Sequence, residues 1–96
     1  MASVSDTVSL TLIGKPGCHL CDEARDAVRG VLDDLAADSA VPTPEVRVTE
    51  LSILDNPALM AEFAEEIPVV MIDGRVHTIW RVDAARLRTA LLEAAS

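Results

Sequence analysis

Residues 8–21 read VSLTLIGKPGCHLC, and this stretch decides the fold. Apolar and polar residues alternate over Val8–Ile13, which predicts a β-strand with one apolar face. Two glycines and a proline then break the strand over residues 14–17. Beyond them, an apolar residue recurs every three or four positions, which predicts an amphipathic helix over about Cys18–Ala37. The apolar face of this helix would consist of Cys21, Ala24, Val28, Val31, Leu32 and Leu35.

The middle of the chain predicts a second strand and a second helix. A loop with two prolines, Asp38–Glu45, precedes a strand over Val46–Leu51, where apolar and polar residues alternate again. Asn56 is a suitable N-cap and Pro57 a suitable first residue for the next helix. Its apolar face would consist of Met60, Phe63, Ala64 and Ile67, and Pro68 would end it.

The last third predicts a hairpin and a third helix. Val69–Ile72 is an apolar run of the length of a buried strand, and Asp73-Gly74 is a typical two-residue hairpin turn. Arg75–Ile79 would return as the fourth strand. Asp83 is placed to cap a final helix. The apolar face of that helix would consist of Ala84, Leu87, Leu91 and Ala94.

The resulting order of elements is β-α-β-α-β-β-α. The first β-α-β unit should be parallel with a right-handed crossover, and the closing hairpin must be antiparallel. We therefore expect an α/β fold with a four-stranded mixed sheet, formed by residues 1–96 as one domain. The core would be built from Val, Leu, Ile and Ala with Met60 and Met71, because Phe63 and Trp80 are the only aromatic residues.

Composition excludes several classes of protein. The formal net charge of −8 disfavours binding to nucleic acids and to anionic membranes. Met1–Asp6 lacks the basic and apolar regions of a secretory leader, and no segment has the ~20 apolar residues of a membrane span. We therefore expect a cytoplasmic protein. We also expect a monomer, because so few aromatic residues offer no evident interface.

The two cysteines carry the chemistry. Residues three apart on a helix share one face, so the sulfurs of Cys18 and Cys21 can meet. A disulfide between them closes a very small loop and adds little stability, which suits a bond that opens and closes. Cys18 lies at the expected helix N-terminus, where free N–H groups and the dipole stabilise a thiolate, and Lys15 and a protonated His19 would add to this. Cys21 faces the core and would be the resolving thiol.

Other uses of the same pair stay open. Cys18 and Cys21 could form half of a zinc site with His19 or His77, although His19 lies between them and reaches such a metal poorly. They could bind an iron–sulfur cluster at a dimer interface with external thiols. They could also be inert thiols in a module that only binds a partner.

With GKPGCHLC at residues 14–21 and EIPVV at residues 66–70, nearly the whole chain resembles glutaredoxins, and in particular bacterial proteins with a C-x-L-C-D-x-A motif. The resemblance implies a thioredoxin-like fold and a thiol–disulfide oxidoreductase. It would act on protein or small-thiol mixed disulfides, with no bound cofactor. An external reductant would supply electrons: glutathione, another low-molecular-weight thiol, or a reductase. It also implies a cis Ile67–Pro68 peptide opposite Cys18, whose backbone pairs with the substrate.

The sequence departs from typical glutaredoxins at two places. His19 and Leu20 replace Pro and Tyr between the cysteines, and no glycine pair precedes Asp83. Glutathione binding is therefore open, and Asp83 is either a remnant of that site or only an N-cap. Trp80 either covers part of the substrate groove or packs against the rest of the protein. Lys15 either lies near the thiolate and an anionic substrate or is exposed to solvent. Arg81 and His77 are interpreted as surface residues.

Overall fold

A computed structural model describes residues 7–40 and 43–95. The expectations for Met1–Asp6 and Pro42 lie outside the described residues. The elements follow the expected order β-α-β-α-β-β-α, with one short 3₁₀ turn, η1, added before the second helix. They are β1 (Thr7–Gly14), α1 (His19–Ala37), β2 (Glu45–Ser52), η1 (Ile53–Asp55), α2 (Pro57–Phe63), β3 (Val69–Ile72), β4 (Arg75–Ile79) and α3 (Ala84–Ala95).

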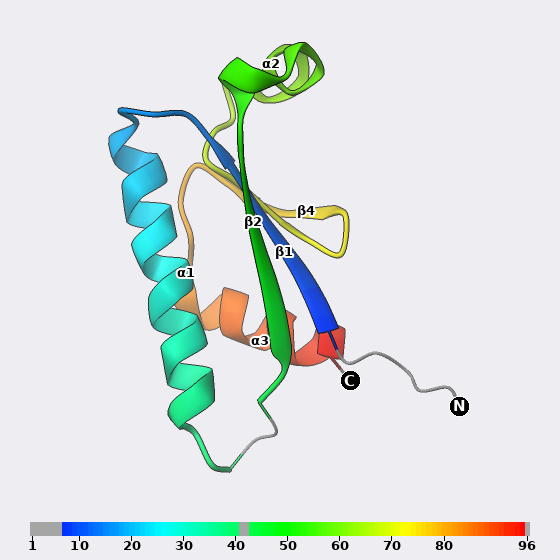
Figure 1. Ribbon diagram of the computed structural model, residues 1–96. Coiled ribbons are helices and arrows are strands. Elements are labelled where there is room, and N and C mark those ends of the chain that lie inside the picture. Colours follow the sequence, from blue (N-terminus) through cyan, green and yellow to red (C-terminus); the bar gives the residue numbers. More distant parts are fainter. Residues whose placement is uncertain (1–6, 41–42, 96) are drawn as a thin grey trace, which may run out of the picture.

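The strands form a mixed sheet in the order β2-β1-β3-β4. β1 runs parallel to β2 and antiparallel to β3, and β3 pairs antiparallel with β4. Helices α1 and α3 lie on one side of this sheet, whereas α2 lies beyond the end of β2 (Figure 1). The expected α/β fold with a four-stranded mixed sheet is therefore confirmed.

Side chains from the two faces of the sheet enter two separate clusters. Alternate residues of β1 point towards α1 and α3, because successive side chains of a strand lie on opposite faces. This larger cluster contains Val8, Leu10, Leu12, Ala24, Val28, Val31, Leu35, Val70, Leu87 and Leu91. Ile13 and Val69 lie on the opposite face and pack with Ile53 and Phe63. α1 therefore reaches the sheet with the apolar face that its sequence predicts.

The apolar faces predicted for the other two helices are partly wrong. In α2, Met60 is 38% exposed and does not join the core, because Phe63 pairs with Leu59, one turn earlier. α2 ends at Phe63, so Ala64 is an exposed cap residue, whereas Met71 and Ile67 do pack against the smaller cluster.

In α3, only Leu87 and Leu91 of the predicted apolar face are buried. Ala84 and Ala94, at the two ends of the helix, are exposed. Leu92 and Ala95 pack against the core instead.

The caps and the hairpin turn predicted from sequence are confirmed. Asn56 Oδ1 accepts a hydrogen bond from the Ala58 N–H at 2.9 Å, and Asp83 Oδ1 accepts one from the Arg86 N–H at 3.1 Å. Asp73 and Gly74 both have positive φ, 50° and 82°, as a type I′ hairpin turn requires.

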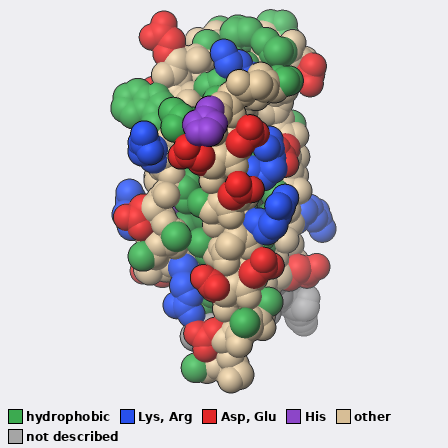
Figure 2. Space-filling view, turned by 90° about the vertical axis from the view of Figure 1, so that its left-hand side faces the viewer, with side chains coloured by type: hydrophobic (Ala, Val, Ile, Leu, Met, Phe, Trp, Pro, Cys, Tyr) green, Lys and Arg blue, Asp and Glu red, His purple; other side chains and the backbone are tan. Residues whose placement is uncertain are grey.

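Within the described residues, no helix combines the length and the apolar character that crossing a membrane requires. Figure 2 shows the side of the molecule that α1 covers. Acidic and basic side chains alternate along most of this side, and hydrophobic side chains gather at its upper end. That end carries α2 and the start of α1 (Figure 1).

Candidate functional site

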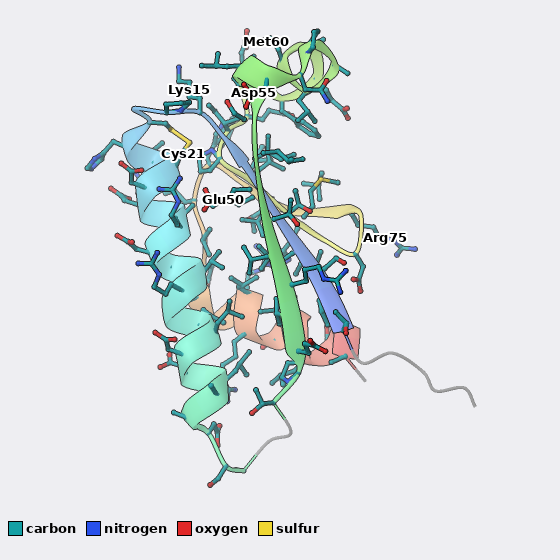
Figure 3. All side chains as sticks on the ribbon, in the orientation of Figure 1. Lys15, Cys21, Glu50, Asp55, Met60 and Arg75 are labelled. Atoms are coloured by element: carbon teal, nitrogen blue, oxygen red, sulfur yellow. A yellow bond between two sulfur atoms is a disulfide. The ribbon has the colours of Figure 1, made fainter. Side chains whose placement is uncertain are left out.

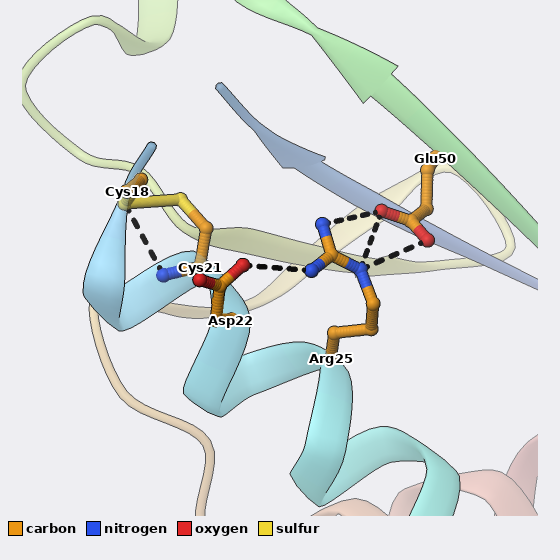
Figure 4. Close-up of a disulfide and its surroundings, with 5 residues drawn as sticks. All are labelled: Cys18, Cys21, Asp22, Arg25 and Glu50. Carbon is orange, nitrogen blue, oxygen red and sulfur yellow. Dashed lines mark hydrogen bonds and ion pairs between the residues drawn. A yellow bond between two sulfur atoms is a disulfide. The ribbon is translucent and has the colours of Figure 1, made fainter. Parts of the chain in front are cut away.

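Cys18 and Cys21 form a disulfide at the start of α1 (Figure 4). Their Cα atoms are 5.1 Å apart. Cys18 is the N-cap residue, and its Sγ accepts a hydrogen bond from the Cys21 N–H at 3.2 Å. An N-cap side chain accepts from the free N–H groups of the first turn, so the backbone of α1 is directed at the sulfur of Cys18.

The two sulfurs differ in their exposure to solvent. Cys18 is half-buried at the surface, whereas Cys21 is 1% exposed and lies on the core face of α1. Gly14, at the end of β1, makes this burial possible. A Cβ atom at Gly14 would lie only 2.8 Å from Cys21 Sγ, so the sulfur occupies space that a side chain would otherwise fill.

The two residues expected to support the thiolate, Lys15 and His19, are both exposed. Lys15 is exposed in the turn between β1 and α1, at the end of the molecule that holds the disulfide (Figure 3). The side chain of His19 is 88% exposed, and its Nε2 lies 3.1 Å from Glu23 Oε2. The structure therefore pairs His19 with a carboxylate on the next turn of α1.

A hollow of about 380 Å³ lies beside Cys21, and Lys15 is one of its lining residues. Its lining includes charged and polar side chains that were not among the predicted site residues: Asp22, Arg25, Glu50, Ser52 and Asp55. Figure 3 shows that Glu50, on β2, lies below Lys15 and Asp55.

Arg25 links α1 to β2 across this hollow. Its Nε donates to the two carboxylate oxygens of Glu50 at 2.9 and 3.1 Å, and its Nη1 donates to Asp22 at 2.8 Å (Figure 4). The hydrogen bonds to Glu50 and then to Asp22 raise the pKa of Arg25 above its ordinary value. Two signals in the sequence point to Arg25: it follows Cys21 by four positions and Asp22 by three, which places all three on one side of the helix.

The Ile67–Pro68 peptide bond is cis. Ile67 is half-buried against the smaller core cluster, and Pro68 is fully buried. The carbonyl oxygen of Pro68 accepts a hydrogen bond from the Trp80 N–H at 2.8 Å, so this loop is tied to the end of β4.

The segment after β4 has an exposed tryptophan. Trp80 is 53% exposed with φ of 68°, and its Nε1 donates to the Glu65 carbonyl at 3.0 Å. Trp80 lines one hollow together with Leu20, which is one of the two residues between the cysteines. Asp83 caps α3, and the Arg81 side chain is exposed as expected, 4.0 Å from Glu23.

His77 is less exposed than predicted. It is half-buried on β4, and its Nε2 is buried without a hydrogen-bond partner among the described residues. Burial is the main cause that lowers the pKa of His77, and nearby Arg86 adds to it. Across residues 7–40 and 43–95, no three His, Cys, Asp or Glu side chains gather in a way that would hold a metal ion.

Comparisons with known proteins identify the family. Residues 9–92 match the model of the glutaredoxin-like domain (DUF836). Uncharacterized protein Rv0508 of Mycobacterium tuberculosis is 34% identical over 77 residues, which cover 80% of this chain and 75% of that protein.

Solved structures agree with this assignment. Protein XcR50 from X. campestris is 32% identical with a TM-score of 0.61, over 85% of this chain and 93% of that one. Chloroplastic thioredoxin z is similar in fold only, at 14% identity, with a TM-score of 0.67 over 93% of this chain and 79% of that one. The chain, with its paired cysteines at the start of α1, has a thioredoxin-like fold and belongs to the glutaredoxin-like domain family.

Proposed function

We propose that this protein is a thiol–disulfide oxidoreductase in which Cys18 is the nucleophile and Cys21 the resolving thiol. The observation that supports these roles is the unequal exposure of the two sulfurs. Cys18 is accessible at the N-cap of α1, whereas Cys21 is buried directly behind it. A substrate disulfide would therefore react with Cys18 first. In the mixed disulfide that results, Cys18 Sγ is the sulfur atom within reach of Cys21.

The cycle starts from the reduced dithiol. The thiolate of Cys18 attacks one sulfur of the substrate disulfide, forms a mixed disulfide and releases the other substrate half as a thiolate. The thiolate of Cys21 then attacks Cys18 Sγ, which releases the second half and forms the Cys18–Cys21 disulfide. Two electrons pass to the substrate. An external thiol reductant returns them by reducing the disulfide, so the reaction needs no bound cofactor.

Further residues are proposed to support this cycle. N–H groups of the first turn of α1 stabilise the Cys18 thiolate, with additional positive charge from Lys15. The backbone of Ile67 and Pro68 would pair with an extended substrate. We expect a monomer that acts in a reducing cytoplasm on protein or small-thiol mixed disulfides, without nucleic-acid or membrane partners.

Single-turnover reduction of a small neutral disulfide, bis(2-hydroxyethyl) disulfide, tests the assignment. Reduced wild type should consume it and end as the Cys18–Cys21 disulfide. The Cys21→Ala variant should stop with one mercaptoethanol half on Cys18, which mass spectrometry detects. Cys18→Ser should form no adduct, although it folds, because serine is also a good N-cap.

Two results would contradict the proposal. The first is a folded, reduced wild type that leaves the disulfide and other small disulfides intact. A module that binds partners without redox chemistry would then be favoured. The second is a Cys18→Ser variant that forms an adduct on Cys21 as fast as Cys21→Ala forms one on Cys18. That result would reverse the two roles.

A further inference from the structure

Trp80 has a backbone conformation that is rare for a bulky side chain. Its φ of 68° and the hydrogen bond from the Arg81 N–H to the Ile79 carbonyl, at 2.8 Å, define a γ-turn of the strained kind. Two other hydrogen bonds hold the residue, from its N–H to Pro68 and from its ring to Glu65. The ring is therefore fixed in place and yet exposed.

The fixed ring lines two hollows. The first, of about 230 Å³, has Leu20, Glu23 and Arg81 in its lining. The second, of about 370 Å³, lies towards α2. Because Leu20 lies between the cysteines and lines the first hollow together with Trp80, a polypeptide attached to Cys18 would pass close to this ring.

The second hollow has a strongly negative lining. Besides Trp80 and two alanines, it is lined by Glu62, Glu65 and Glu66, and by no basic residue. Over the described part of the chain, none of these three carboxylates makes an ion pair. Arg81 and Arg86 line a neighbouring hollow together with Glu62 and Glu66 but lie beyond ion-pair distance.

We propose that this surface, formed by Trp80, Glu62, Glu65 and Glu66 and named here the Trp80 surface, docks a basic residue of a polypeptide substrate close to its disulfide. Carboxylates attract a Lys or Arg side chain, and the exposed face of an indole binds the same cation. The net charge of −8 adds attraction at longer range. The inference rests on the proposed function, and it names the class of substrate for that site.

Paired peptide substrates test the inference. Each peptide carries one cysteine in a mixed disulfide with mercaptoethanol, flanked by two Arg residues in one peptide and by two Glu residues in the other. Bis(2-hydroxyethyl) disulfide is the reference, because it reports the chemistry without docking. We expect kcat/KM to be about tenfold higher for the basic peptide at low salt, and most of this preference to disappear at high salt.

Three variants locate the effect. Glu62→Gln/Glu65→Gln removes two exposed carboxylates, and Asp33→Asn/Asp34→Asn makes the same change in net charge far along α1. Trp80→Gly removes the ring while the backbone keeps its positive φ at no steric cost. We expect the first and third variants to reduce the preference to about threefold or less and the Asp variant to retain it. The Glu and Asp variants should reduce the neutral reference at the wild-type rate, and the preference of Trp80→Gly is the ratio of its kcat/KM values for the two peptides.

The outcomes separate the two proposals. If wild type fails on the neutral reference, the redox function itself is wrong. If it reduces the reference but treats both peptides equally, only the Trp80 surface is wrong. An equal loss of preference in the Glu and Asp variants would show that net charge steers the peptide, and it would also overturn the local site.

Discussion

Replacing Gly14 by alanine tests the packing beneath the disulfide. The added Cβ atom would lie 2.8 Å from Cys21 Sγ, closer than Cβ atoms approach other atoms in proteins, and 3.2 Å from Cys21 Cβ, which is also a tight contact. Cys21 has no room to move, because it is buried on the core face of α1 and bonded to Cys18. The start of α1 must therefore shift away from β1.

The size of the effect follows from two opposing terms. Overpacking of a well-filled core costs about 1–3 kcal/mol. Alanine offsets about 0.5–1 kcal/mol of this, because it has less conformational freedom than glycine in the unfolded chain. We therefore expect Gly14→Ala to lower the free energy of unfolding by about 1–2 kcal/mol. Gly30 is the matched control: it lies inside α1 with nothing within 4 Å of an added Cβ, so Gly30→Ala should stabilise by about 1 kcal/mol.

Urea unfolding of the oxidised proteins measures the effects of Gly14→Ala and Gly30→Ala. If the free energy of unfolding depends on urea concentration with the same slope in all proteins, only stability has changed. The same substitution in a Cys21→Ala background removes the sulfur that causes the clash. There, the cost of Gly14→Ala should fall by about 1 kcal/mol, as expected for residues in contact. The reasoning would be refuted if Gly14→Ala were as stable as wild type. It would also be refuted if Gly14→Ala lowered the free energy of unfolding by the same amount in the Cys21→Ala background as in wild type.

Three further predictions concern stability. Asp73→Ala should lower the free energy of unfolding in urea by about 1–2 kcal/mol, because Asp73 Oδ1 accepts a hydrogen bond from the Ser9 N–H at 2.9 Å and the φ of Asp73 is positive. Asp73→Asn should lower it far less, because asparagine tolerates positive φ and keeps the accepting oxygen. Asn56→Ala should cost about 1 kcal/mol by the loss of the α2 cap, and equal stability would contradict that role. The pKa of His77 is lowered in the folded state, so the unfolded chain binds its proton first. His77 should therefore not affect the free energy of unfolding above about pH 6.5, and this free energy should fall as the pH drops below that value. In His77→Gln it should fall less steeply with pH.

Local rules of sequence were sufficient for most of the fold. The strand, break and helix over residues 8–37 have distinct periodicities, so β1 and α1 could be placed without tertiary information. The turn at Asp73-Gly74 and the caps at Asn56 and Asp83 depend on side chains that bond their own neighbouring backbone. Features that arise within a few residues of the chain are those that sequence alone predicts.

The parallel first β-α-β unit was predicted, but several other features that depend on contacts between distant segments were not. Alanine fits both exposed and buried positions, so the helical pattern did not distinguish Ala84 or Ala94 from the residues that pack. The Arg25–Glu50 pair joins positions 25 residues apart, and only the parallel pairing of β1 with β2 brings them together. The exposure of Trp80 depends on the turn that follows β4, for which the sequence contains no glycine.

The different roles proposed for the two cysteines follow from where α1 begins. An N-cap residue lies just outside the helix, so the side chain of Cys18 remains accessible while free N–H groups point towards it. Three residues later, Cys21 belongs to the stripe that continues at Ala24 and Val28, and the stripe faces the sheet. Gly14 leaves the space that the inner sulfur fills. A helix that began one residue earlier or later would change the accessibility of both sulfurs, so the N-cap position of Cys18 is as much a part of the site as the cysteines themselves.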